Sequence, residues 1–246
     1  MIDLHCHLLP GIDDGPATME ESLAMARAAS ADGSRVIVAT PHVSWTYPRN
    51  TAALISAKVD EVRAALSRAE IDLDVRKGAE VDVTRAAQLD DSDLRALGLG
   101  GGPWLLVECP LQAYSSSVLA AALRSLAARG HHLVLAHPER CRAFQRDPDA
   151  LTALVADGMV TCITAAALNG RFGRSSRALA RALVRDGDAH VVASDAHDSA
   201  RRSPQLRSEL EAAGLAWQAP VLADATPAAI LDGTRLPLAT SDPVWP

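Results

Sequence analysis

Residues 1–16 read MIDLHCHLLPGIDDGP and carry the clearest structural signal in the chain. His5 and His7 stand in an H-x-H pattern at the end of a short apolar run, and Asp13 and Asp14 follow soon after. Alternate side chains of a β-strand point to the same side, so both imidazoles would face one site at the end of a first strand. Burying so many polar groups costs free energy unless they share partners. The stretch therefore predicts a strand that leads into a polar site.

Beyond this first strand, short β-branched runs alternate with longer stretches of helical period. The predicted strands are residues 1–6, 35–40, 74–81, 104–109, 132–137, 159–164 and 190–194. The predicted helices are residues 18–30, 50–69, 115–130, 148–158, 175–187 and 203–214, the first with a capping box of Thr18 and Glu21. The Gly-rich residues 97–103 are expected to form a loop before the fourth strand. This alternation indicates a parallel sheet, either closed as a barrel or open and doubly wound.

Polar side chains fall at the ends of six of these strands. They are His5 and His7 at the end of the first, His42 after the second, Glu80 and Glu108 at the ends of the third and fourth, His137 at the end of the fifth, and Asp195 and His197 at the end of the seventh. Parallel barrels assemble their active sites at the C-terminal ends of the strands, so this distribution favours a barrel. His131, His132 and His190 start strands and are expected to be ordinary hydrogen-bonding residues at the opposite end.

With an aspartate from the DD pair, nine ionisable groups converge on one site. Such a cluster needs a counter-charge, which metal ions would supply. Imidazole mixed with carboxylate suits Mn, Fe or Zn better than Ca or Mg.

Composition narrows the class of protein. The chain has 246 residues, 48% of them hydrophobic, which suffices for one domain over residues 1–246. A net charge of −6 opposes broad contact with nucleic acid. We expect a cytoplasmic protein with reduced thiols, because we find no signal peptide, no run of membrane length and no C-x-x-C pair. A cysteine-dependent phosphatase is excluded because none of the four cysteines starts a C-x5-R motif: Ile12, Ser115, Asp147 and Leu168 occupy the arginine position.

These motifs together resemble those of the PHP (polymerase and histidinol phosphatase) superfamily. The matching segments are MIDLHCHLLPGIDDGP, ATPH (39–42), KGAEV (77–81), AHPER (136–140), NGRFG (169–173) and SDAH (194–197). The likeness is strongest to the CpsB/CapC branch, the manganese-dependent protein-tyrosine phosphatases of bacteria, and runs in order from Ile2 to about Leu206.

The resemblance implies a distorted (β/α)7 barrel with three divalent metal ions. Mn is the expected metal, with Fe and Zn as the alternatives. By position, it implies one ion on His5, His7, Glu80 and Asp195. A second would be held by Glu80, Glu108 and His137, and a third by Asp14, His42 and His197. Asp13 stays an alternative to Asp14, because adjacent carboxylates cannot be separated by sequence.

Charge counting agrees with phosphate chemistry. Four carboxylates and three divalent ions would leave the cluster with a charge of about +2, which attracts a phosphate dianion. A metal ion also lowers the pKa of a bound water from about 15.7 toward neutrality, so a metal-activated hydroxide could attack phosphorus. Arg140 and Arg202 occupy positions that the family uses for phosphate contact.

Three functions stay open at this point. The first, which the resemblance implies, is hydrolysis of phosphotyrosine on the tail of a bacterial tyrosine kinase that regulates capsule or exopolysaccharide synthesis. The second is a small-molecule phosphatase of the histidinol-phosphate type. The third is a non-catalytic metal-binding module. The oligomeric state is left open, and neither nucleic acid nor membrane insertion is expected.

Overall fold

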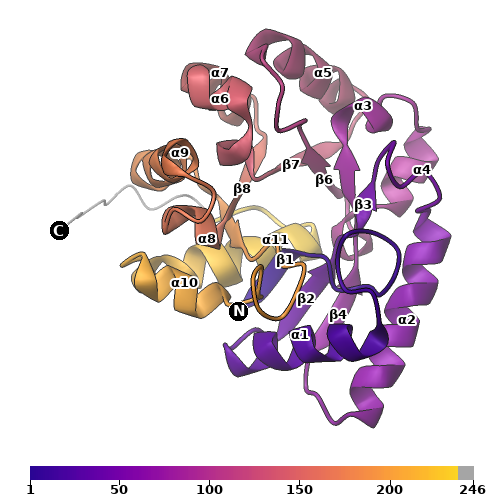
Figure 1. Cartoon of the computed structure of the whole chain (residues 1–246). Coiled ribbons are helices and arrows are strands. Elements are labelled where there is room, and N and C mark those ends of the chain that lie inside the picture. The colour runs from indigo at the N-terminus through magenta and orange to yellow at the C-terminus, as the bar shows by residue number, and fades with distance from the viewer. Residues whose placement is uncertain (238–246) are drawn as a thin grey trace.

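The computed structural model of the chain describes residues 1–237, in which short parallel strands alternate with helices (Figure 1). The strands are β1 (Ile2–Cys6), β2 (Val36–Ala39), β3 (His42–Val43), β4 (Asp74–Lys77), β5 (Glu80–Asp82), β6 (Trp104–Glu108), β7 (His132–Ala136), β8 (Val160–Thr164) and β9 (Val191–Ala193). The longer helices are α1 (Met19–Ala31), α2 (Ala52–Arg68), α5 (Ser116–Ala128), α7 (Pro148–Ala156), α9 (Arg174–Asp186), α10 (Leu206–Ala212) and α11 (Thr226–Asp232). Shorter ones are α3 (Val83–Ala86), α4 (Asp91–Ala96), α6 (Arg142–Arg146), α8 (Ala165–Leu168), η1 (Leu99–Gly101), η2 (Pro138–Arg140), η3 (Ala216–Gln218) and η4 (Val221–Ala225).

Two parallel sheets lie at the centre of the molecule. One has the strand order β1-β2-β4 and the other β3-β5-β6-β7-β8-β9, and every registered pair between neighbours is parallel. In Figure 1 most of the helices surround the strands. The predicted parallel α/β alternation is therefore confirmed. None of the helices within residues 1–237 combines the length and apolar character needed to cross a bilayer.

The second predicted strand, residues 35–40, corresponds to β2 and is followed by a separate short strand, β3, whereas the third, residues 74–81, is divided into β4 and β5, which belong to different sheets. Pro41 lies between β2 and β3; it has no N–H to donate to a ladder, while its carbonyl accepts the Glu80 N–H at 3.1 Å. Between β4 and β5, a Cβ at Gly78 would lie 2.7 Å from Val38 Cγ1, so only glycine allows this approach. The prediction of one strand over residues 74–81 is therefore wrong, and Glu80 begins β5 instead of ending a strand.

Two apolar clusters hold the strands and helices together. The inner cluster takes buried residues from the strands and closes on η1 and α11: Ile2, Leu4, Val38, Leu99, Trp104, Leu106, Val134, Ala136, Val160, Cys162, Val191, Ala193, Ile230 and Leu231. The outer cluster joins other strand residues to the apolar faces of α1, α2, α5, α7 and α9. The strands that contribute to both clusters are therefore buried on both sides, as the apolar runs of a parallel sheet require, whereas β4 keeps Asp74 exposed.

Strand β1 contains a bulge that re-aims its side chains. Between its pairings with Ile37 and Ala39 of β2, it uses one residue more than β2 does. A bulge changes which side chains face which side of a sheet. Leu4 can thus join the inner cluster while the next residue, His5, points to the polar end of the strands.

The end of β1 also contacts the segment that follows β9. Cys6 forms an isolated parallel bridge with Ala196, and the His7 N–H donates to the Ala196 carbonyl at 2.9 Å. The Asp195 N–H donates to the His5 carbonyl at 2.8 Å. These backbone bonds bring both histidines and Asp195 to the same end of the molecule.

Candidate metal centre

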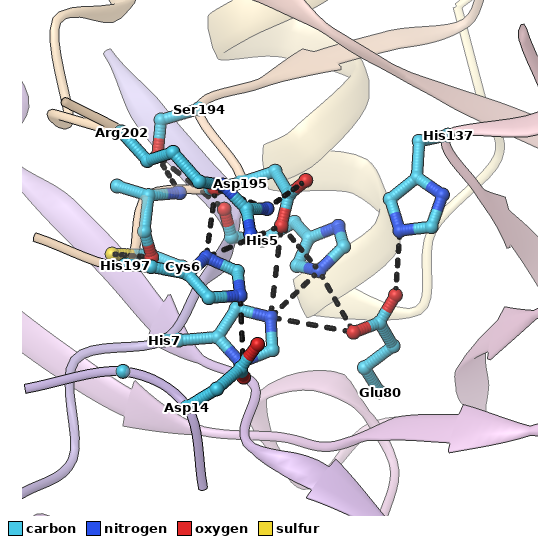
Figure 2. Close-up of polar contacts among 12 residues, drawn as sticks. His5, Cys6, His7, Asp14, Glu80, His137, Ser194, Asp195, His197 and Arg202 are labelled. Carbon is cyan, nitrogen blue, oxygen red and sulfur yellow. Dashed lines mark hydrogen bonds and ion pairs between the residues drawn. The ribbon is translucent and has the colours of Figure 1, made fainter. Parts of the chain in front are cut away.

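The nine side chains predicted as metal ligands come together at one end of the strands. They are His5 in β1, His7 just after it, Asp14 in the loop before α1, His42 at the start of β3, Glu80 at the start of β5, Glu108 at the end of β6, His137 after β7, and Asp195 and His197 after β9. Figure 2 shows His5, His7, Asp14, Glu80, His137, Asp195 and His197 among them. Each has a ring nitrogen or carboxylate oxygen within 4.0 Å of another member. Their role as ligands stays a prediction, but the proximity it needs is present.

Glu80 is the hub of this cluster. Its Oε1 lies 2.8 Å from His137 Nε2. Its Oε2 lies 3.0 Å from His42 Nδ1, 3.3 Å from His7 Nε2 and 3.4 Å from His5 Nε2, yet it has no hydrogen bond of acceptable geometry. A fully buried carboxylate oxygen without a hydrogen bond is costly. A cation between this oxygen and the surrounding imidazoles would satisfy both.

Asp195 joins the imidazoles to the two predicted arginines. Its Oδ1 lies 3.5 Å from His5 Nε2, and its Oδ2 accepts hydrogen bonds from Arg140 Nη1 and, at 2.7 Å, from Arg202 Nη2. Arg202 Nη2 also donates to the backbone carbonyl of Asp195 at 3.2 Å. Both arginines therefore lie directly beside the candidate ligands, where a phosphate would bring its oxygens.

The adjacent carboxylates Asp13 and Asp14 occupy different places. Asp14 Oδ1 lies 3.4 Å from His42 Nε2 and 3.4 Å from His197 Nε2, so it faces the cluster. Asp13 Oδ2 lies 2.7 Å from His7 Nδ1, on the ring nitrogen away from Glu80, and accepts the His42 N–H at 3.1 Å. This is how a carboxylate orients a ligating histidine without binding the metal. The geometry therefore favours Asp14 as the ligand and gives Asp13 a supporting position.

Four groups of these side chains could each hold a cation, because their ligand atoms lie within 4.8 Å of one another. They are His7, Asp14, His42 and His197; His5, His7 and Glu80; His5, His137 and Asp195; and His42, Glu80 and Glu108. The set predicted for the third ion, Asp14, His42 and His197, lies together in the first of these groups, which also contains His7. The other two are regrouped, since His137 lies with Asp195 and Glu108 lies with His42. The donor set and the orphaned oxygen of Glu80 both fit a transition-metal ion.

The charged groups of the cluster shift one another's pKa values. Burial opposes a charge on His7, but Asp13 and Glu80 outweigh it and raise its pKa to about 10. Burial and the Glu80 carboxylate raise the pKa of Glu108 to about 8. Burial opposes a charge on Glu80, yet the charge of His5 and the hydrogen bond to His137 hold the pKa of Glu80 well below its usual range. Protons thus balance the carboxylates when no cation does.

Several supporting residues were not predicted from the sequence. Glu139 is fully buried, its Oε1 accepts the Thr164 N–H at 3.0 Å, and burial raises its pKa to about 7. Asp3 accepts the Ser194 N–H at 3.0 Å. The Tyr47 ring is stacked on His42, with centroids 5.7 Å apart. Glu139 could have been found from its place inside HPER, whereas nothing in the local pattern marks Tyr47.

The histidines predicted to be ordinary hydrogen-bonding residues lie elsewhere. His131 Nε2 lies 3.0 Å from Asp91 Oδ1, and His190 Nδ1 accepts the Thr161 N–H at 3.2 Å. His132 packs against Trp104. None of the three belongs to the groups that could hold a cation within residues 1–237.

The chain is similar to proteins of known activity. The family model for capsular polysaccharide synthesis proteins of the CpsB/CapC type matches residues 1–214. Tyrosine-protein phosphatase YwqE of Bacillus subtilis (strain 168) is 34% identical over 203 residues, which cover 82% of this chain and 80% of YwqE. Putative tyrosine-protein phosphatase CapC of Staphylococcus aureus is 29% identical over 209 residues, covering 84% of this chain and 81% of CapC.

A solved structure extends this similarity to the whole chain. It comes from work on YwqE from Bacillus subtilis and CpsB from Streptococcus pneumoniae, described as metal-dependent tyrosine phosphatases, and superposes with a TM-score of 0.82 at 29% identity over 100% of both chains. The match to the family model, the level of identity to YwqE and the shared fold agree with one another. The chain therefore belongs to the CpsB/CapC family of capsular polysaccharide synthesis proteins.

Proposed function

We propose that the chain is a metal-dependent protein-tyrosine phosphatase. The observation that carries the proposal is the buried Glu80 Oε2, which faces three imidazole nitrogens within 3.4 Å without a hydrogen bond, next to two arginines. Cations and a phosphate group are complementary to this arrangement. Family membership and the named activity of the relatives support the same conclusion.

The nine clustered side chains would hold the metal ions. When bound, divalent ions supply positive charge that attracts phosphate and lower the pKa of water toward neutrality. Asp13 keeps the His7 ring in place through the 2.7 Å contact to Nδ1, which leaves Nε2 directed at the cluster. We propose three ions, with Mn favoured over Fe and Zn.

Arg140 and Arg202 would bind the phosphoryl group. Each presents a planar guanidinium that can hold two oxygens, and each is anchored on Asp195. These side chains can stabilise the charge that develops as the bond to the leaving group breaks. Tyrosine leaves as a phenolate with a pKa of about 10, so it needs less protonation than an aliphatic alcohol does.

The finer features of fold and context are part of this proposal. The nine strands form seven strand regions, because β3 follows β2 and β5 follows β4 after a short break. These regions and the bridge between Cys6 and Ala196 support a distorted (β/α)7 barrel that forms one domain over residues 1–246. The substrate would be a phosphotyrosine-bearing tail of a tyrosine kinase that regulates capsule or exopolysaccharide synthesis in the cytoplasm. Capsule synthesis is the process for which the family is named.

A substrate panel on one Mn-loaded preparation tests the proposal. We expect phosphotyrosine peptides and aryl phosphates to be hydrolysed much faster than phosphoserine peptides or alkyl phosphates, and single-stranded DNA not to be cleaved. Chelation should abolish the activity and Mn should restore it. Equal rates on histidinol phosphate would favour the small-molecule alternative, and an active preparation without bound metal would overturn the metal-dependent mechanism.

A further inference from the structure

A pocket of about 430 Å³ lies beside the candidate metal centre and shares Arg140 with it. Its other walls come from the loop after β6, from α6 and from the start of α9, and they include Arg142, Phe172 and Arg174. The Arg140 guanidinium carbon lies 4.4 Å from the centroid of the Phe172 ring. One arginine therefore contacts Asp195 of the metal centre and also borders the pocket.

Two of the three arginines of the pocket have no acidic partner, whereas the third, Arg140, is paired with Asp195. The described residues around the pocket include no aspartate or glutamate. Arg142 and Arg174 are exposed, and within residues 1–237 neither forms an ion pair. The nearby Arg171, by contrast, is paired with Glu209. Two exposed, unpaired arginines that line one pocket in a chain of net charge −6 create a local positive field.

Polar groups of the pocket extend this preference for anions. Gly173 caps the 13-residue helix α9 without a side-chain hydrogen bond, so the N–H groups of its first turn keep partial positive charge. Gln145 Nε2 is held by the Glu139 carbonyl at 2.8 Å and by Ser176 Oγ at 3.1 Å, which fixes one wall. The pocket is thus a preformed receptor for a small negatively charged group.

We propose that this pocket binds a carboxylate side chain, Asp or Glu, that lies next to the phosphotyrosine in the substrate. This inference rests on the proposed function, because it assumes that a phosphotyrosine enters beside Arg140. An extended peptide advances about 3.3 Å per residue, so a neighbouring residue can reach a pocket that shares Arg140 with the phosphate site. Arginine pairs with carboxylates in a planar, two-pronged geometry, which suits Arg142 and Arg174 to this role.

Paired peptides measure the preference directly. One phosphotyrosine peptide carries Asp or Glu on both sides of the phosphotyrosine, and its partner carries Asn or Gln at the same positions. We expect kcat/KM to be higher for the acidic peptide by about fivefold for each arginine, mainly through KM and less so at high salt. R142A and R174A should each remove most of the gain in kcat/KM for the acidic peptide that one arginine contributes. The rate on para-nitrophenyl phosphate should stay at the wild-type value.

R68A is the matched control, because Arg68 is an exposed arginine at the end of α2 and does not line the pocket. It should keep the full preference. Equal kcat/KM for both peptides in the wild-type protein would overturn the inference while leaving phosphotyrosine hydrolysis intact. A gain only when a second phosphotyrosine replaces the carboxylates would overturn the carboxylate assignment. No hydrolysis of any phosphotyrosine peptide would instead contradict the proposed function.

Discussion

Asp195 shows how single atoms organise this site. One carboxylate oxygen, Oδ1, faces the imidazoles of His5 and His7, at 3.5 and 3.6 Å, while the other, Oδ2, accepts hydrogen bonds from Arg140 and Arg202. A carboxylate with both oxygens engaged has little freedom to turn. The same side chain can therefore serve as the predicted metal ligand and hold in place both arginines that we propose to bind the phosphate.

The first prediction concerns Arg140. Arg140→Ala should lower kcat/KM on a phosphotyrosine peptide by about 100-fold or more, the scale of losing one charge-stabilising donor. Metal content should stay unchanged, because Arg202 still holds Asp195 Oδ2. Arg140→Lys should recover only part of the loss, since an ammonium cannot make the two-pronged contact. Steady-state kinetics with elemental analysis check this, and wild-type kinetics in Arg140→Ala would contradict it.

Replacing Arg202 in the same steady-state kinetic experiment gives a comparison with Arg140. Arg202→Ala should reduce activity less, with the change mainly in KM, if this arginine only binds the incoming phosphate. A loss in kcat as large as that of Arg140→Ala would assign both arginines to the transition state.

The second prediction separates the adjacent aspartates. Asp14→Asn should lose one metal equivalent and most activity, because Asp14 lies 3.4 Å from the Nε2 atoms of both His42 and His197. Asp13→Asn should keep the metal site but weaken metal affinity by about 10- to 100-fold, as expected when the carboxylate behind a ligating histidine is removed. Metal content measured at fixed free Mn distinguishes the two variants. A full metal complement in Asp14→Asn would contradict the assignment.

For single residues, the sequence predicted which side chains lie together at the site, but not which of them face the same candidate ion and which support a neighbouring ligand. The convergence of His5, His137 and Asp195 follows from placing polar residues at the ends of parallel strands. Neighbouring residues such as Asp13 and Asp14 differ only in loop conformation, which local pattern does not encode. The regrouping of His137 with Asp195 depends on side-chain directions set by packing.

Among the elements, α11 has a role that its length does not suggest. Ile230 and Leu231 enter the inner cluster with Ile2 and Leu4 of β1, so the helix covers the apolar interior between the strands. Leu231 also packs so near Gly100 that a Cβ there would lie 2.8 Å from its Cδ2. The helix therefore fits closely against the Gly-rich segment.

The third prediction tests this packing. Ile230→Ala should lower the free energy of unfolding by about 2–4 kcal/mol, because Ile230 is fully buried and the cavity left behind cannot close completely. Activity at low temperature should be unchanged, since the change lies away from the metal centre. Urea unfolding measures the effect. Trp217→Ala, at a side chain 51% exposed, is the control and should change stability by less than about 1 kcal/mol.

Helices and strands could be predicted from the sequence where their hydrophobic pattern is long enough to repeat. Helix α1 was predicted with its capping box, and the structure contains both bonds between Thr18 and Glu21. Helices α3 and α8 have four residues each, about one turn, and no periodicity can reveal them. The break at Gly78 arises from its contact with Val38, which is distant in sequence.

For the molecule as a whole, metal binding and folding should be linked. The predicted ligands are spread between His5 and His197, so their cluster exists only in the folded chain. An ion that binds only the folded state stabilises it by about 2.7 kcal/mol when its concentration is 100 times the Kd.

The fourth prediction follows from this linkage. Removing metal should lower the Tm, and adding Mn should restore it, as measured by differential scanning calorimetry. The double variant His5→Ala/His7→Ala should lose much of the increase, because these histidines line three of the four candidate groups. An equal Mn-dependent increase in that variant would place the stabilising metal elsewhere.

The inner cluster also has a consequence for the order in which the protein is made. Its first strand, β1, leaves the ribosome at the start of synthesis, whereas α11 follows only after all nine strands have emerged. Until then Ile2 and Leu4 lack the cover that Ile230 and Leu231 provide. A nascent chain that still lacks α11 thus exposes apolar surface of β1, which makes this interval the one in which a chaperone would be needed.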